Sequence, residues 1–282
     1  MRALFRRPVI ATIIILAVLG VGTFVLVGLG KKAPSAPSVP IEKTNDAGPK
    51  HRVIGQSLEG REIQGYAYGT GEKHLAFVGG IHGGYEWNSV LLAYQFMDYL
   101  EKNASVIPKN LTVTIIPSAN PDGVYKVIGK EGRFTLADAP TDKEVAALGR
   151  FNAHGVDLNR NFDCKWKPES MWRAKIVSAG SEPFSEPEAR AIRDFVLENN
   201  PDAVIFWHSQ SNAVYASECE AGILPETLDI MNAYSHASGY PAVKSFDSYN
   251  ITGDAEGWLA SIGIPAITVE LQTHETIEWE QN

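Results

Sequence analysis

Gly79-Gly80-Ile81-His82-Gly83-Gly84-Tyr85-Glu86-Trp87-Asn88 is the stretch around which the rest of the chain is organised. Residues 75–78, directly before it, form a short apolar run typical of a buried strand, and residues 87–102 continue with helical periodicity. Open α/β sheets bind ligands beyond the carboxyl ends of their strands, at turns of this kind. We therefore expect His82 and Glu86 to project together into a ligand site.

An imidazole and a carboxylate supply two of the three protein ligands that a catalytic zinc ion usually takes. His208 is the candidate third ligand, because it follows the apolar run 203–207 and is also expected at the end of a strand. The alternative is that His82 and Glu86 are ordinary polar residues at the start of a helix. The remaining histidines are expected at the surface or in loops, namely His51, His74, His154, His236 and His274.

The 282 residues suit one large domain with an appendage, and 44% hydrophobic with 21% charged residues is ordinary for a globular protein. Charge is unevenly distributed. Residues 1–52 contain 8 basic and 2 acidic residues, which leaves 17 basic against 31 acidic downstream, a net charge of -14. This acidic body argues against nucleic acid as a partner.

The N-terminus carries an uncharged apolar stretch at residues 8–30, preceded by three arginines and followed by two lysines. Its length is sufficient to cross a bilayer. We predict a signal anchor over residues 1–30, with the body of the protein on the extracytoplasmic side of the membrane. A signal peptide that is removed on export, giving a secreted protein, is the alternative. Residues 31–50 are rich in Pro and Ser and are predicted to form a linker, so the folded domain should span 51–282.

Strand-like and helix-like segments alternate along this domain and predict a three-layer α/β fold. The expected strands are 61–68 and 73–78, joined as a hairpin, followed by 111–116, 203–207 and 264–271. The expected helices are 87–102, one near 143–148 within the long loop 124–156, one opened by a capping box at Ser185 and Glu188, and then 225–237 and 255–262.

Seven motifs follow one another in an order that resembles the zinc carboxypeptidase family, the relatives of carboxypeptidase A. They are His82 with Glu86, Asn120-Pro121-Asp122-Gly123, the stretch 155–162, the stretch 184–188, Trp207-His208-Ser209, Tyr249 nine residues before Trp258, and Thr268-Val269-Glu270-Leu271. The resemblance covers about residues 52–275. It implies an α/β/α architecture with a mixed, twisted sheet of about eight strands, and one Zn²⁺ per chain.

The resemblance also implies roles for matched residues. His82, Glu86 and His208 would hold the zinc ion, and Glu270 would be the general base that takes a proton from the attacking water. An unpaired carboxylate inside the apolar segment 264–271 would otherwise be costly, although a structural salt bridge is the alternative. Most relatives space the first two ligands as His-x-x-Glu. Here Glu86 lies four positions after His82, with three residues between them, and the turn is expected to absorb the additional glycine.

The remaining matched residues concern the substrate. Arg150 would stabilise the oxyanion, although Arg133 lies in the same loop as an alternative. Asn159 and Arg160 would bind the terminal carboxylate of the substrate. Tyr249 would close over that carboxylate, unless it is simply an exposed loop aromatic.

Two further pairs of residues bear on the pocket and the compartment. Asp254 and Glu256 lie between Tyr249 and Trp258, where relatives build the pocket for the departing residue, so an amine-bearing terminal residue is predicted. Either acid could instead begin a helix. Cys164 and Cys219 each follow a site motif, and in an exported domain they are predicted to form a disulfide.

The sequence therefore predicts a zinc metallocarboxypeptidase that removes lysine, arginine or diaminopimelate from the C-terminus of a peptide or a murein peptide. Two alternatives remain open: an amidohydrolase acting on small N-acyl amino acids, and a zinc-binding or peptide-binding module without catalysis.

Overall fold

The computed structural model of the protein describes residues 48–282. The predicted anchor and the linker up to residue 47 lie outside the described residues. Within the described part, no helix combines the length and the apolar character that crossing a bilayer requires.

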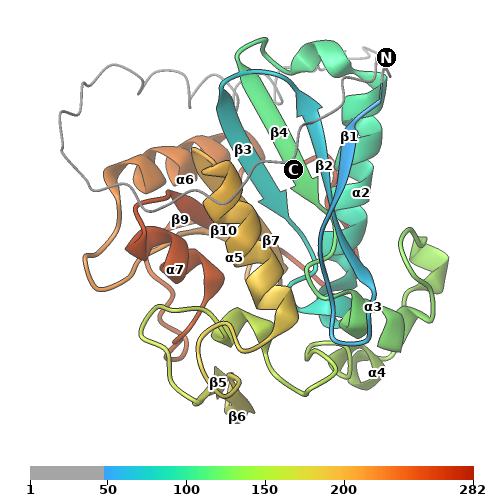
Figure 1. The fold of residues 1–282 in the computed structure, drawn as a ribbon, viewed down its shortest axis with the longest axis vertical. Helices are drawn as coiled ribbons and strands as arrows, with labels where there is room; N and C mark the ends of the chain where they lie inside the picture. The colour runs from blue at the N-terminus through green and yellow to red at the C-terminus, as the bar shows by residue number, and fades with distance from the viewer. Residues whose placement is uncertain (1–47) are drawn as a thin grey trace, which may run out of the picture.

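A mixed sheet of eight strands forms the centre of the domain (Figure 1). The strands are β1 (Lys50–Gln56), β2 (Glu62–Gly69), β3 (Lys73–Val78), β4 (Leu111–Ile116), β7 (Ala203–Ser209), β8 (Ala213–Ala216), β9 (Ala242–Val243) and β10 (Ala266–Leu271). Their order across the sheet is β1-β2-β4-β3-β7-β10-β8-β9. The central strands β4, β3, β7 and β10 run parallel, and antiparallel strands flank them. A separate hairpin consists of β5 (Glu169–Trp172) and β6 (Lys175–Ser178).

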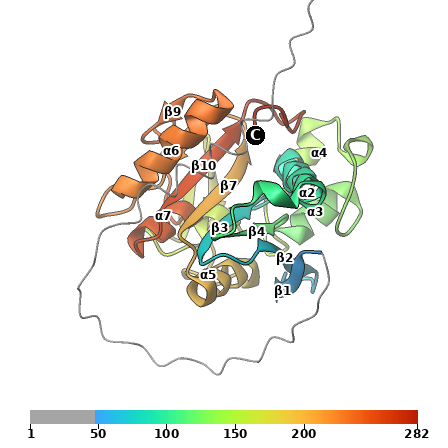
Figure 2. The ribbon, with the colours of Figure 1, turned by 90° about the horizontal axis from the view of Figure 1, so that it is seen from above.

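Helices cover both faces of this sheet, which confirms the predicted three-layer α/β fold (Figure 2). On one face, α2 (Trp87–Lys102) and α6 (Pro225–Ser238) pack with Phe77 and Trp207 in a large apolar cluster. On the other face, α5 (Pro187–Asn199) and α7 (Ala255–Ser261) pack with Val78 and Phe206. Neighbouring residues of β3 and β7 thus point to opposite faces, and the central strands are apolar throughout because both faces are buried.

The register of the parallel strands determines where the site lies. His208 of β7 is paired with Glu270 of β10, so both side chains emerge at the same carboxyl edge. Strand β3 is paired with β7 on its other side and ends at Val78, four residues before His82. Three neighbouring strands therefore deliver three predicted site residues to one end of the sheet.

Two predicted local features, a hairpin and a capping box, are wrong. Strands β2 and β3 do not form a hairpin, because β4 lies between them, antiparallel to β2 and parallel to β3. The capping box at α5 is also absent. Ser185 Oγ donates instead to Glu186 Oε1, and Glu188 accepts hydrogen bonds from the Leu58 amide at 3.0 Å and from Asn152 Nδ2 at 3.1 Å. The Ser185 hydroxyl and the Glu188 carboxylate, which a capping box would pair with backbone amides at the helix start, thus bond to other partners.

Several short elements were not predicted. The turn-forming run before residue 124 begins helix α3 (Pro121–Ile128), where Asn120 Oδ1 accepts the Gly123 amide as an N-cap. Strands β1 and β8 and the β5–β6 hairpin also lie in segments without a clear alternating pattern. The predicted short helix is present as α4 (Lys143–Ala147).

Cys164 and Cys219 form a disulfide, as predicted, with their Cα atoms 6.1 Å apart. It joins the loop that follows Arg160 to the loop that follows β8, and both cysteines are buried. Disulfides of this kind persist in oxidising compartments, so this bond agrees with an extracytoplasmic location.

Replacing both cysteines by serine is expected to lower the free energy of unfolding by about 2–5 kcal/mol, because a long closed loop is then released in the unfolded chain. Urea unfolding of the oxidised wild type and of the Cys164→Ser/Cys219→Ser variant measures this difference. Two titratable thiols in the denatured, unreduced wild type would contradict the bond itself.

Candidate metal centre and active site

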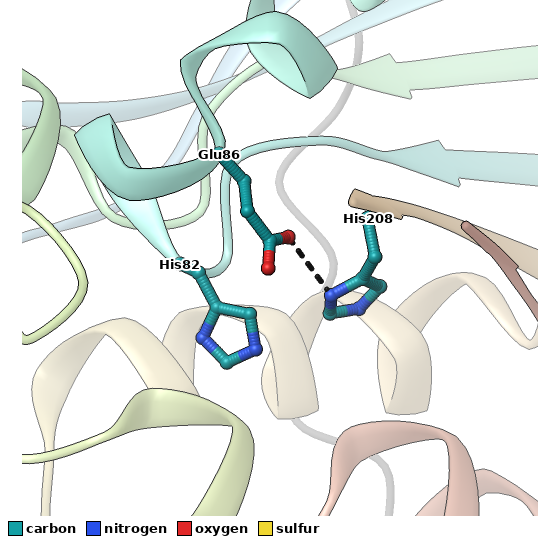
Figure 3. A group of neighbouring side chains, drawn as sticks. All are labelled: His82, Glu86 and His208. Carbon is teal, nitrogen blue, oxygen red and sulfur yellow. Dashed lines mark ion pairs between the residues drawn. The ribbon is translucent and has the colours of Figure 1, made fainter. Parts of the chain in front are cut away.

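His82, Glu86 and His208 converge at the carboxyl edge of the sheet (Figure 3). One possible ligand atom from each residue lies within 4.8 Å of the others, and all three residues are buried. Glu86 Oε2 is 3.1 Å from His208 Nδ1 but has no hydrogen-bond partner among the described residues. A buried carboxylate oxygen without a donor, placed between two imidazoles, is the arrangement that a cation would satisfy. The donor set fits a catalytic zinc ion.

The turn that carries His82 and Glu86 absorbs the additional residue in a single 3₁₀ turn, Gly83–Glu86. Gly83 has φ +48°, and a Cβ atom there would lie 2.5 Å from the carbonyl oxygen of Gly149. At Gly84 a Cβ atom would lie 2.7 Å from the carbonyl oxygen of Gly123. Only glycine fits both positions, so the two glycines allow the four-residue spacing to bring Glu86 back to His82.

Asp157 lies next to the candidate metal ligand His82. Its Oδ1 is 3.4 Å from His82 Nδ1, and its Oδ2 accepts hydrogen bonds from Arg150 Nε at 2.9 Å and from Nη2 at 2.8 Å. Asp157 opens the Asp-Leu-Asn-Arg motif, but its sequence position alone does not indicate this contact. A carboxylate behind a ligating imidazole restricts the orientation of the ring and raises its basicity.

The charges of the cluster set its protonation. Burial, and then the positive charge of Arg150, lower the pKa of His82 to about 4, which leaves the imidazole neutral. Burial alone would raise the pKa of Glu86, but His82 and His208 outweigh it and lower that pKa to about 2. Although burial opposes it, the carboxylates of Glu86 and Glu256 raise the pKa of His208 well above its ordinary value. A metal ion would displace that proton, since metal ligands bind in their deprotonated form.

Glu270 stands beside this cluster on β10, partly buried in the wall of a cavity of about 230 Å³. Burial, and then the negative charge of Glu86, raise the pKa of Glu270 to about 7. Its Oε2 is buried and has no hydrogen-bond partner among the described residues. A carboxylate of this kind can accept a proton near neutral pH.

The same cavity brings together the residues predicted to bind the terminal carboxylate, which are Asn159, Arg160 and Tyr249. Arg160 is 2% exposed, and its guanidinium donates to the carbonyl oxygens of Met171 and Asn159. These bonds hold the guanidinium in one orientation at the cavity wall. Tyr249 is partly buried and not a freely exposed loop residue.

The two predicted pocket acids have different surroundings. Asp254 caps α7, with its Oδ2 accepting the Gly257 amide at 2.7 Å. Glu256 is buried and makes three contacts: Asn159 Nδ2 at 3.2 Å, His208 Nε2 at 3.1 Å and Thr268 Oγ1 at 2.9 Å. Both acids line the cavity, but Glu256 also contacts a candidate metal ligand, which the sequence did not indicate.

Arg150 lies outside the lining of this cavity. Its guanidinium packs over the Trp172 ring at 4.6 Å, and its Nη1 is 3.9 Å from Glu86 Oε1. It is thus adjacent to the metal centre, held by Asp157. The alternative, Arg133, pairs with Asp98 at 2.8 Å on α2.

His274 lies in the loop that follows β10, as expected, but the sequence does not indicate its contacts there. Its Nδ1 is 2.6 Å from Ser209 Oγ, and its ring lies 4.5 Å from the ring of Tyr85. Ser209 also donates to Asn88 Oδ1 at 3.0 Å. These contacts bring the C-terminal segment against the metal ligands, through partners too distant in sequence to form a motif.

Comparisons with known proteins agree with this geometry. A sequence model of the family described as "Zinc carboxypeptidase" matches residues 47–277. Gamma-D-glutamyl-L-diamino acid endopeptidase 1 of Lysinibacillus sphaericus is 27% identical over 241 residues, covering 77% of this chain and 59% of the relative. Carboxypeptidase B of Astacus astacus is 30% identical over 168 residues, covering 56% of this chain and 53% of the relative. The chain thus spans less than two thirds of the length of either relative.

Solved structures share the fold. A murein-tripeptide amidase from Escherichia coli O157 superposes with a TM-score of 0.56 and 23% identity, covering 80% of this chain and 85% of the other. Thrombin-activatable fibrinolysis inhibitor superposes with a TM-score of 0.64 and 20% identity, covering 83% of this chain and 64% of the other. Because the family match extends over most of the sequence, this chain belongs to the zinc carboxypeptidase family, whose cofactor is Zn²⁺.

Proposed function

We propose that the protein is a zinc-dependent carboxypeptidase that hydrolyses the last peptide bond of its substrate. The observation that carries this proposal is one cavity in which His82 and His208 of the metal cluster, the partly buried Glu270 and the pair Asn159 and Arg160 meet. His82, Glu86 and His208 would hold the metal. When bound, zinc supplies a Lewis acid that lowers the pKa of water toward neutrality.

Glu270 and Arg150 carry out the proton transfer and the charge stabilisation. Glu270 takes a proton from the attacking water and passes it to the departing amine, because its carboxylate stands next to the cluster. Arg150 stabilises the negative charge that develops on the carbonyl oxygen. It would have to act at the edge of the cluster, since Asp157 already holds its Nε and Nη2.

Selectivity for the chain end comes from the cavity beyond the metal cluster. Asn159 and Arg160 bind the terminal carboxylate, and Tyr249 closes over it. Glu256 and Asp254, which both line this cavity, favour a departing residue that carries an amine, such as lysine, arginine or the diaminopimelate of murein peptides. Two similar proteins, a gamma-D-glutamyl-L-diamino acid endopeptidase and a murein-tripeptide amidase, are named for substrates that fit this preference. A deacylase of small N-acyl amino acids and a non-catalytic binding module are not favoured by the family assignment.

We also propose that residues 8–30 anchor the protein in a membrane with the catalytic domain outside the cytoplasm. This proposal rests on the apolar sequence of that segment and on the disulfide of the domain.

Replacing Glu270 by glutamine removes the proposed base and keeps the size of the side chain. We expect about 10²–10⁴-fold slower hydrolysis of a peptide ending in lysine, with one zinc ion retained per chain. Single-turnover assays and metal analysis of the purified variant measure the two quantities. Turnover equal to that of the wild type would show that the base lies elsewhere.

Replacing Glu256 by glutamine is expected to reduce the preference for C-terminal lysine over phenylalanine by about 10–100-fold in kcat/KM, because a charged contact to the amine is lost. Asp254→Asn is the matched variant, since asparagine caps a helix about as well as aspartate. It should preserve more of the preference. Equal wild-type turnover of the two substrates would remove the basis for an acidic pocket.

External protease applied to intact cells that express the full chain should release the catalytic domain, and the untreated protein should sediment with the membrane fraction. A protein that stays in the soluble cytoplasmic fraction, protected from the protease, would contradict both the anchor and its orientation.

A further inference from the structure

A second cavity of about 560 Å³ lies beside the metal cluster. Tyr85 and Trp87, on either side of Glu86, form part of its wall, and Gln210, two residues after His208, forms another part. The β5–β6 hairpin contributes Trp172 and the basic residues next to it. The cavity thus adjoins the same two segments that carry the candidate metal ligands, and it shares none of its lining residues with the first cavity.

This position indicates which part of a substrate reaches the second cavity. If the proposed function holds, the terminal carboxylate and the departing residue occupy the first cavity, with Asn159 and Arg160. The scissile bond then lies at the metal cluster. The acyl part of the substrate must continue away from the first cavity, past Tyr85.

The two cavities differ in charge. The first is lined by four acids and two fixed cations: Glu218, Asp254, Glu256 and Glu270 against Arg160 and Lys165. The second is lined by Lys143, Arg173 and Lys175 against Glu144 and Glu275. Lys143 lies 3.9 Å from Glu275, so these two charges largely compensate each other. Arg173 and Lys175 remain as basic groups against the single carboxylate of Glu144.

The hairpin presents these two basic residues in a defined way. Trp172 pairs with Lys175 across the hairpin, so Arg173 and Ala174 form its two-residue turn. Arg173 adopts φ +56°, a conformation in which glycine or asparagine is normally favoured at such turns. A non-glycine residue with positive φ costs free energy and is a known sign of functional constraint. The turn thus holds the Arg173 guanidinium at the cavity, at a position where glycine or asparagine would be conformationally favoured.

Aromatic side chains line the cavity next to these charges. The rings of Tyr85 and Trp172 pack edge to face with centroids 5.2 Å apart, and Lys175 Nζ lies 5.4 Å from the Trp172 ring. His274 also lines the cavity, next to the Tyr85 ring, and is held by Ser209. Burial is the main cause that lowers the pKa of His274; the negative charge of Glu86 opposes it, and the positive charges of Arg173, Lys143 and Arg150 add to the lowering.

We propose that the second cavity is a subsite for a carboxylate on the acyl side of the scissile bond, recognised by Arg173 and Lys175. The substrate class is then a peptide in which an acidic residue precedes a C-terminal amine-bearing residue. The acid can come from an α-linked glutamate side chain or from the α-carboxylate of a γ-linked glutamate. Both present a carboxylate to the acyl cavity and an amine to the first.

The test compares three peptides that end in lysine, in which the preceding residue is α-linked glutamate, γ-linked glutamate or α-linked glutamine. For the wild type we expect kcat/KM to be about 5- to 50-fold higher for at least one glutamate peptide than for the glutamine peptide, the range between an exposed ion pair and a charged hydrogen bond. The preferred glutamate peptide identifies which linkage the site accepts. The preference should shrink as salt concentration rises.

The Arg173→Gln/Lys175→Gln double variant should hydrolyse the glutamine peptide as the wild type does and lose most of the preference for glutamate. Arg193→Gln, on α5 and outside both cavity linings, is the matched control and should retain it. Equal wild-type values for glutamate and glutamine peptides, or an unchanged preference in the double variant, would overturn the subsite.

A binding measurement separates this inference from the proposed activity. Calorimetric titration of zinc-loaded Glu270→Gln protein with the same three peptides requires no turnover. Tighter binding of a glutamate peptide, lost in the variant that also carries Arg173→Gln and Lys175→Gln, supports the subsite even if no peptide is hydrolysed. Hydrolysis without any difference in binding or in kcat/KM between the peptides rejects the subsite and leaves the carboxypeptidase activity intact.

Discussion

Parallel pairing of β3, β7 and β10 is the constraint on which the site depends. A parallel register places residues at the ends of neighbouring strands side by side, and here it aligns His208 with Glu270. The turn after β3 then supplies His82 and Glu86 from the adjacent strand. Because both faces of these strands pack against helices, a slip of one residue would turn every side chain to the opposite face, disrupt both packed layers and separate these four residues at once.

A buried polar network extends this constraint beyond the sheet. Asp157 links His82 to Arg150, and Asn152, two residues after that arginine, donates to Glu186 at 2.7 Å and to Glu188 at 3.1 Å at the start of α5. The loop that carries the candidate substrate-binding residues Asn159 and Arg160 is thereby fastened to the start of α5. Removing one partner from such a network leaves a buried charge uncompensated, which costs more than the pair itself contributes.

The sequence predicted the long elements and the metal cluster because their signals are local. Helix α2 has continuous apolar periodicity, and the ligands sit beside apolar runs that end at them. The pairing of β2 with β4, the partners of Ser185 and the position of His274 depend on contacts between residues far apart in the chain. No spacing rule encodes these contacts. Asp157 belongs to a motif that the sequence does show, but only its distance to His82 in the structure indicates its role.

Glu256 combines two sets of contacts in one side chain, since it bonds both His208 and Asn159 while lining the cavity that is proposed to receive the departing residue. An enzyme whose selectivity depends on one isolated pocket residue can change its substrate preference by a single substitution. Here, any replacement at this position also changes the contact with His208, a candidate metal ligand. Evolution or engineering toward apolar terminal residues would therefore have to proceed through at least two coordinated changes, one to reshape the pocket and one to restore the imidazole's partner.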